Sequence, residues 1–430
     1  MKTEKVLKDY QKMAGRCLRC SFCKFIPQVA IKSQEFSTIC PSIDLFNYHS
    51  YSGGGRLVTA LAILTNRLSF SEDVLDVIYK CTECGGCDVA CKYLNTLEPL
   101  EVIQALREQA VESNAGPMPA QKAYLQRVEE FHNPYGEKHE DRFAWLPNDV
   151  KVVENASIAY FVGCTSAYRR KEIAIATARV LNAAGVKFTI LGEDEFCCGS
   201  PLLRVGAKAD FAELAKHNIE ALQKRGIKQV IMSCAGCFST FSNEYPRVAK
   251  LGFKVFHTSQ YFEHLLKTKK LKPKTSIPMI ATYHDPCHLG RCAEPYKKWR
   301  GIEFKVMSFI HVSIPPKPMR RGKNGVYAPP RKVIQQIPGL QFVEMERNQE
   351  YAYCCGAGGG VKAAFPEFAL HTAKTRLNEA LKTGAQILIS ACPFCATNLQ
   401  DAIQESGESM QYYDISEILL RSLQTGEREK

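Results

Sequence analysis

Apolar residues in the first quarter of the chain recur at helical spacing. In segments 57–64 and 74–78, leucine, isoleucine, valine or alanine return every three or four positions, and Ser71 precedes the second segment as a candidate N-cap. Segment 97–113 repeats this spacing. The pattern therefore predicts a mostly helical N-terminal domain over residues 1–111.

The pattern changes after a segment rich in proline, glycine, asparagine and histidine. Residues 112–155 are predicted to be a linker that contains one helix, at about 119–131. Short apolar runs then alternate with helical stretches. The predicted strands are 157–163, 187–191, 228–233, 279–286 and 386–390, and the predicted helices are 169–185, about 207–224 and about 361–382.

This alternation predicts two α/β domains with mainly parallel sheets, over residues 156–272 and 273–430. The second domain carries an insert at about 301–330 that is basic and rich in proline. Because no period is evident in it, the insert is interpreted as a surface excursion. The fold class is therefore α plus α/β.

Composition restricts the function classes. The chain has 430 residues, 45% of them apolar, and a formal net charge of +12. Its nineteen cysteines, an odd number, and its charged N-terminus argue against a secreted disulfide framework. No stretch approaches the roughly 18 apolar residues of a spanning helix. We expect a protein of the reducing cytoplasm, with any membrane contact made through a partner.

The first eight cysteines form two ferredoxin-type runs. Each run places three cysteines at i, i+3 and i+6, and a fourth cysteine follows them: Cys40 in the first run and Cys91 in the second. In two-cluster ferredoxins the fourth ligand comes from the other run. On that rule one [4Fe–4S] cubane is held by Cys17, Cys20, Cys23 and Cys91, and a second by Cys40, Cys81, Cys84 and Cys87. The N-terminal domain is thus predicted to be ferredoxin-like in its clusters.

Zinc is the alternative metal for these runs. It prefers paired C-x-x-C knuckles with four ligands in all, which a triple with a distant fourth cysteine fits poorly. Nucleic-acid binding is the alternative interpretation of the basic charge, but no recognition motif supports it. A [4Fe–4S]²⁺ core with four thiolates carries a charge of about −2 and would offset part of the excess.

Ten further cysteines form two copies of one pattern. The first copy is Cys164, the doublet Cys197-Cys198 and the pair Cys234 and Cys237; the second is Cys287, the doublet Cys354-Cys355 and the pair Cys392 and Cys395. Each group follows a predicted strand, at the edge where open α/β sheets gather ligands. The spacing from the first cysteine to the doublet is 33 positions in the first copy and 67 in the second, and the insert accounts for the difference. Cys292 fits neither copy.

These spacings resemble the cysteine-rich CCG domains of heterodisulfide reductases. With the two-cubane domain in front, the whole chain resembles the D-type subunit of these enzymes, in which a small cubane-carrying unit is fused to a catalytic one. The resemblance implies one noncubane [4Fe–4S] cluster on each copy, both facing a cavity between the domains where a disulfide is reduced or formed. It implies catalytic roles for Cys198 and Cys355.

Other residues near the cysteines are candidates for supporting roles. His284 and His288 flank Cys287 and could protonate a departing thiolate, or could cap a helix or bond a sulfide. Arg291 could bind cluster charge or an anionic substrate, or lie at the surface. Gly199 and Gly356 follow the doublets and could let backbone amides approach a cofactor, as could Gly358–Gly360.

Two functions remain open at this level. One is a heterodisulfide reductase-like enzyme subunit that acts on a small disulfide or thiol. The other is a non-catalytic electron carrier serving a flavin dehydrogenase, a quinone-linked enzyme or an electron-bifurcating complex. The expected partner is a flavoprotein, a reductase A-like subunit or a membrane cytochrome b, and not a nucleic acid. A zinc-dependent interaction protein is a third class, distinguished by metal analysis.

Overall fold

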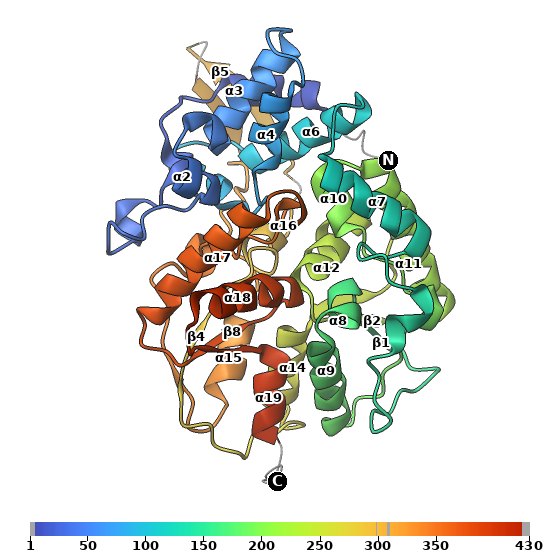
Figure 1. Cartoon of the computed structure of the whole chain (residues 1–430). Coiled ribbons are helices and arrows are strands. Elements are labelled where there is room, and N and C mark those ends of the chain that lie inside the picture. Colours follow the sequence, from blue (N-terminus) through green and yellow to red (C-terminus); the bar gives the residue numbers. More distant parts are fainter. Residues whose placement is uncertain (1–4, 298, 308–309, 424–430) are drawn as a thin grey trace.

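The N-terminal quarter is helical, as predicted. In the computed structural model, which describes residues 5–297, 299–307 and 310–423, the helices lie at one end of the molecule (Figure 1). They are α1 (Gln11–Gly15), α2 (Pro41–Phe46), α3 (Gly53–Leu64), α4 (Glu72–Tyr79), α5 (Gly86–Cys91) and α6 (Pro99–Glu112). Ser71 caps α4 by accepting a hydrogen bond from the Val74 amide. Leu57, Ile78 and Leu106 are among the residues of their shared core.

Segment 112–155 packs against the first repeat over part of its length. It contains α7 (Pro119–Phe131) at the predicted place and a short 3₁₀ turn, His139–Phe143. Arg142 and Trp145 are buried, and Trp145 belongs to the large core that the two α/β repeats share. The composition of this segment indicated a linker, but the segment places two buried side chains on the first repeat.

The first repeat has a parallel sheet in the order β1-β2-β3. The strands are β1 (Ile158–Phe161), β2 (Gln229–Met232) and β3 (Lys254–His257). The helices are α8 (Cys164–Tyr168), α9 (Lys171–Ala183), α10 (Ser200–Val205), α11 (Lys208–Lys224), α12 (Ala235–Ser239), α13 (Tyr245–Val248) and α14 (Thr258–Lys267). The sequence had not indicated β3.

The second repeat has a parallel sheet in the order β7-β4-β8-β9. Its strands are β4 (Ile280–Tyr283), β7 (Gln341–Phe342), β8 (Ile387–Ser390) and β9 (Gln411–Asp414). Its helices are α15 (Ala328–Gln335), α16 (Val361–Ala364), α17 (Pro366–Leu381), α18 (Pro393–Ser406) and α19 (Ile415–Leu423). The topology repeats that of the first sheet, with β7 as an added edge strand.

Two predicted elements differ from the structure. Segment 187–191 forms only an isolated bridge, Thr189 to Ala159, at the position that β7 takes in the second sheet. It lies at the sheet edge, makes two backbone hydrogen bonds to β1, and turns away at Gly192. The predicted helix 361–382 is broken at Phe365, because Pro366 disfavours helical backbone in the residue before it.

The insert also differs from the prediction. Residues expected to be a surface excursion without period form an antiparallel hairpin, β5 (Ile302–Val306) and β6 (Ile310–Ile314). Part of the insert packs on the N-terminal domain. The Lys92 ammonium donates to the Arg320 carbonyl at 2.7 Å, and Gly322 lies beside Val89 of α5. The apolar residues at every second position, Ile302, Phe304 and Val306, were the sequence signal for a strand here.

The two repeats pack together in a pseudo-symmetric way. Helix α9 of the first repeat contacts α19 of the second, and α15 of the second contacts α14 of the first, as the lower half of Figure 1 shows. Likewise α8 contacts α18, and α12 contacts the turn Arg291–Ala293 that follows Cys287. The segments that carry cysteines in one repeat therefore face those of the other.

A membrane-crossing helix would have to be longer and more apolar than any helix found among the described residues.

Candidate iron–sulfur sites

The first cubane group surrounds a hollow in the N-terminal domain. Cys17, Cys20, Cys23 and Cys91 all line it, together with Gly54 at the start of α3. The Gly54 amide donates to the Cys23 sulfur at 3.2 Å. A Cβ on Gly54 would lie 3.4 Å from the Cys17 sulfur, an ordinary van der Waals distance, so Gly54 lies directly beside this group. Cys20 is the exposed member, which puts this group nearest to solvent.

The second cubane group is fully inside the protein. Cys40, Cys81, Cys84 and Cys87 are all buried. Burial raises the pKa of Cys40 to about 12, although the nearby Arg56 guanidinium opposes that shift. Burial likewise raises the pKa of Cys91 in the first group to about 12. A metal that binds these thiols therefore has to displace their protons.

The five cysteines of the first repeat come together at the carboxyl edge of its sheet. Cys164 begins α8 after β1, and Cys234 caps α12 after β2. The sulfurs of Cys198 and Cys237 are 3.3 Å apart without a disulfide bond. The Cys164 thiol lies within hydrogen-bonding reach of Cys197. Four of the five are buried, while Cys234 is partly accessible.

A buried arginine compensates the charge expected at this group. The Arg142 guanidinium lies 3.6 Å and 3.7 Å, by its two terminal nitrogens, from the Cys164 sulfur. It is held by Glu195, whose carboxylate accepts from Arg142 at 2.8 Å and from the Gly163 amide at 2.9 Å. A buried cation needs such a partner. Sequence reasoning missed Arg142, because it lies in the segment interpreted as a linker.

The second repeat gathers its five cysteines in the same way. Cys287 follows β4 and is partly accessible, and Cys392 caps α18 after β8. The Cys354 thiol is within hydrogen-bonding reach of Cys287, and the Cys355 thiol of Cys395. The Gly356 amide donates to the Cys354 sulfur at 3.3 Å. The arrangement offers thiol ligands with amide donors beside them, which suits an iron–sulfur cofactor.

The glycines after both doublets have left-handed backbone. Gly199 has a φ of 78° and Gly356 a φ of 88°. A Cβ at Gly356 would lie 2.4 Å from the Ala369 carbonyl oxygen, so a side chain would displace backbone there. Both glycines therefore turn the chain after the doublet. Gly358 and Gly359 have another contact: they press against the backbone carbonyls of Thr82 and Cys81 in the N-terminal domain.

His284 faces the second repeat's cysteines through one nitrogen. Its Nδ1 accepts a hydrogen bond from Arg376 Nε at 3.1 Å. Since arginine only donates, the proton of the neutral imidazole is on Nε2. His284, Cys355 and Cys395 have their ligand atoms within 4.8 Å of one another. Burial, with the Arg376 charge second, lowers the pKa of His284 to about 3. The ring is therefore a neutral donor whose buried Nε2 has no hydrogen-bond partner among the described residues.

We expect this donor to raise the reduction potential of a cofactor bound by the second repeat. One neutral hydrogen bond contributes about 0.5–1.5 kcal/mol, so His284→Phe should lower the potential by roughly 20–60 mV. His284→Gln retains an N–H donor and is expected to recover part of the difference. Redox titration followed by electron paramagnetic resonance measures both. An unchanged potential in His284→Phe would contradict this role.

The other predicted side chains lie between the N-terminal domain and the second repeat. Arg291 donates to the carbonyls of Cys84 at 2.6 Å, Ala352 at 2.7 Å and Glu350 at 2.9 Å, so it joins two cysteine-bearing segments. His288 is partly buried. Burial lowers its pKa to about 3, and the positive charges of Arg204 and Arg291 add to this shift. The unassigned Cys292 lies 3.3 Å from the Cys84 carbonyl oxygen.

The four groups of cysteines lie in one continuous series. Cys23 shares an apolar cluster with Cys81 and Cys87, which connects the two cubane groups. The Cys84 thiol is within hydrogen-bonding reach of Cys354, which connects the second cubane group to the second repeat. The Cys392 thiol is likewise within hydrogen-bonding reach of Cys234. Each is the first cysteine of the C-x-x-C pair of its repeat, so the two repeats meet at equivalent positions.

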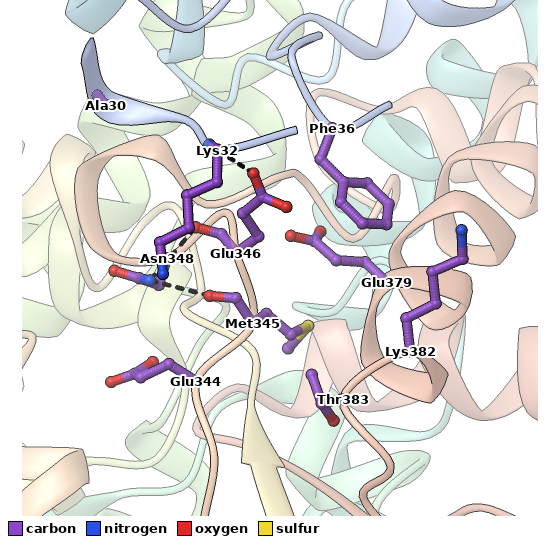
Figure 2. Close-up of a pocket in the computed structure, with 10 residues that line it drawn as sticks. All are labelled: Ala30, Lys32, Phe36, Glu344, Met345, Glu346, Asn348, Glu379, Lys382 and Thr383. Atoms are coloured by element: carbon purple, nitrogen blue, oxygen red, sulfur yellow. Dashed lines mark hydrogen bonds between the residues drawn. The ribbon is translucent and has the colours of Figure 1, made fainter. Parts of the chain in front are cut away.

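A large pocket lies elsewhere, between the loop that precedes Cys40 and the second repeat. Figure 2 shows Lys32 and Phe36 on one side and Glu346, Glu379 and Lys382 on the other. Its acidic groups already have partners. Glu346 accepts from the Lys32 amide at 2.6 Å and from the Ser33 hydroxyl at 2.8 Å, and Glu379 binds a buried arginine. This pocket is therefore part of the contact between two domains.

Comparison with known families agrees with this division of the chain. Residues 13–94 match a 4Fe-4S dicluster domain, and residues 158–242 and 318–400 match the cysteine-rich domain called CCG. The fold and the cysteine groups thus define an iron–sulfur electron-transfer protein built from one dicluster domain and two CCG domains.

The similar proteins include three heterodisulfide reductase subunits of Methanosarcina. The D-type subunit of the dihydromethanophenazine:CoB–CoM heterodisulfide reductase of Methanosarcina barkeri is 39% identical over 95% of this chain and 93% of its own length. That of Methanosarcina acetivorans is 38% identical with the same coverage. This chain belongs to the family of heterodisulfide reductase D-type subunits.

More distant relatives have other names. A probable iron–sulfur-binding oxidoreductase of Bacillus subtilis is 31% identical over 86% of this chain and 50% of its own length. An EtfAB:quinone oxidoreductase of Syntrophomonas wolfei is 28% identical over 81% of this chain and 47% of its own length. These two relatives are thus named as oxidoreductases other than heterodisulfide reductases.

Proposed function

We propose that this protein is the catalytic electron-transfer subunit of a disulfide-reducing complex in the reducing cytoplasm. Eighteen cysteines would hold two cubane and two noncubane [4Fe–4S] clusters, with the ligand sets predicted from the sequence. When bound, these clusters supply one-electron carriers. The substrate would be a small disulfide, reduced by two electrons and two protons to two thiols, or formed in the reverse reaction.

The continuous series of cysteines is the observation that carries this proposal. It begins at the exposed Cys20, passes through the buried second group and ends at the two repeats. Electrons would enter at the solvent-exposed end from a partner such as a flavoprotein or a membrane cytochrome. Cys234 and Cys287 are the partly accessible members of the two five-cysteine groups, and a substrate would reach the site beside them.

The chain's own residues would position the site and balance its charge. Arg142 would offset thiolate charge in the first repeat, and the His284 Nε2 proton would serve sulfur in the second. The hydrogen bond from Arg376 to Nδ1 fixes the imidazole proton on Nε2. His284 would therefore keep this N–H donor in place and tune the reduction potential of the site. A catalytic role for His288 stays a prediction.

The second candidate function is a non-catalytic electron carrier, which the distant quinone-linked and iron–sulfur relatives favour. Anaerobically reconstituted protein separates the two functions. With reduced viologen as donor, the proposal predicts oxidation of viologen that depends on an added small disulfide, with two viologens consumed per disulfide. Full reduction of the clusters without turnover of any disulfide in a panel of anionic and neutral compounds would favour the carrier.

A further inference from the structure

His257 is fully buried at the junction of the two repeats and belongs to neither five-cysteine group. It ends β3 and immediately precedes α14. The register of β2 with β3 pairs it with Met232, two residues before Cys234. Its ring also meets the ring of Phe238 edge-on, with the centroids 5.9 Å apart. His257 therefore lies directly beside the C-x-x-C pair of the first repeat.

Hydrogen bonds fix both the orientation and the tautomer of this ring. The Ser259 amide donates to Nδ1 of His257 at 3.2 Å, and the Ser259 hydroxyl lies 2.9 Å from the same nitrogen. The proton of the neutral ring is therefore on Nε2. Nε2 lies 3.2 Å from the carbonyl oxygen of Ser233 and donates to it. Burial lowers the pKa of His257 to about 4, so the ring is neutral near pH 7.

The same ring reaches into the second repeat. The Ala391 carbonyl is also within hydrogen-bonding reach of His257. Ser233 immediately precedes Cys234 in the first repeat, and Ala391 has the same place before Cys392 in the second. The thiols of these two cysteines are within hydrogen-bonding reach of each other. One side chain thus contacts the backbone before both C-x-x-C pairs, where α12 and α18 begin near the middle of the molecule (Figure 1).

The second repeat has a different residue at the equivalent position. The register of β8 with β9 pairs Asp414 with Ser390, two residues before Cys392, so Asp414 takes the place that His257 has in the first repeat. One oxygen of the Asp414 carboxyl accepts from the Ser416 amide at 2.9 Å. The other oxygen has no hydrogen-bond partner among the described residues. The two C-x-x-C pairs are therefore linked by a side chain from the first repeat, without a matching link from the second.

We propose that His257 is a positioning residue that fixes the separation of the two C-x-x-C pairs. This inference rests on the proposed function, in which each pair ligates one noncubane cluster and both clusters act on one disulfide. Each cluster would carry one electron, whereas a disulfide takes two, so both centres must stay within reach of the same S–S bond. His257 holds the place where the series of cysteine groups passes from the second repeat to the first. It does so without ligating iron or touching the substrate.

Spin–spin interaction between the two noncubane clusters of the full-length, anaerobically reconstituted protein tests this role. A one-electron carrier is paramagnetic in one of its two states, and two paramagnetic centres a short distance apart split or broaden each other's electron paramagnetic resonance signals. We expect such splitting in the wild type and its reduction or loss in His257→Phe, which keeps an aromatic ring but has no donor. His257→Gln keeps an N–H donor and should restore most of the splitting. Iron content should be the same in all three proteins.

Turnover gives a second measurement. For a disulfide of the anionic and neutral panel that the wild type reduces with viologen, kcat should fall by about 10–100-fold in His257→Phe, because a displacement of about 1 Å at a reacting centre can cost about 100-fold. His257→Gln should recover most of this loss. His264→Phe is the matched control, since it makes the same exchange at an exposed position of α14. It should match the wild type in splitting and in kcat.

A comparison of two amides keeps the test decisive if His257→Phe fails to bind iron. His257→Asn and His257→Gln both bury an amide, but only the longer glutamine places its N–H near the position of Nε2, so the splitting should be smaller in His257→Asn. Equal splitting in these two variants, or in His257→Phe and the wild type, would overturn the positioning role and leave the proposed function intact. A fully loaded wild type without splitting would overturn it as well. A wild type that lacks the noncubane signals would overturn the proposed function itself, and this inference with it.

Discussion

Cys198→Ser and Cys355→Ser are each expected to abolish disulfide reduction while both cubanes survive. Each doublet cysteine sits among the other thiols of its repeat, with Cys198 and Cys237 sulfurs 3.3 Å apart. Serine cannot replace a thiolate ligand, so each variant should lose about four irons per chain. Substitution of a residue that only supports a metal ligand already lowers metal affinity or activity by about 10–100-fold. Loss of a ligand itself should therefore lower activity by more than about 100-fold.

Cys292→Ser is the matched control for these variants. Its sulfur contacts the Cys84 carbonyl, and it is predicted to ligate no iron. Iron content should be unchanged and activity should remain within about twofold. Iron analysis, cubane signals in electron paramagnetic resonance and viologen-coupled turnover measure all three variants. Retention of iron in Cys198→Ser and Cys355→Ser, or iron loss in Cys292→Ser, would contradict the assignment of ligands.

Arg107→Leu is expected to destabilise the whole assembly by about 3–5 kcal/mol, the cost of breaking a buried charged network. Arg107 is fully buried on α6 and donates to carbonyls of three parts of the chain. Its partners include Cys81 at 2.7 Å in the N-terminal domain, Arg204 at 2.7 Å in the first repeat and Gly359 at 2.8 Å in the second. Leucine leaves these carbonyls without their donor, and it removes one of the two arginine charges that pair with the buried Glu83 carboxylate.

Two comparison variants isolate this effect. Arg107→Lys keeps the charge but cannot reach several carbonyls at once, so its loss should be intermediate. Arg179→Ala removes an exposed arginine paired with Asp149, and should cost less than about 1 kcal/mol. Unfolding midpoints of the holoproteins, followed by the loss of visible absorption, rank the three. Equal midpoints for Arg107→Leu and Arg179→Ala would contradict the central place given to Arg107.

The cysteine plan and most regular elements followed from the sequence because their signals are local. Thiol spacing, helical periodicity and strand-ending cysteines can each be recognised within a short stretch of chain. The break at Pro366 was also available locally and was overlooked. The hairpin was missed because lysine, arginine and proline around Ile302 and Phe304 obscured a two-residue period.

The supporting side chains could not be predicted, because their partners are distant in sequence. Arg376 reaches His284 across 92 positions, and Arg142 reaches Cys164 from a segment with the composition of a linker. The order of the cysteine groups likewise depends on contacts between domains, such as Cys84 with Cys354. Burial and direction of a side chain are properties of the folded chain, and no spacing rule contains them.

The most direct measurement is the iron and acid-labile sulfide content of anaerobically purified protein, combined with electron paramagnetic resonance of its reduced and oxidised states. Four clusters require about sixteen irons and sixteen sulfides per chain, in two spectroscopic classes of equal abundance. Colourless protein that contains zinc and negligible sulfide would contradict the account.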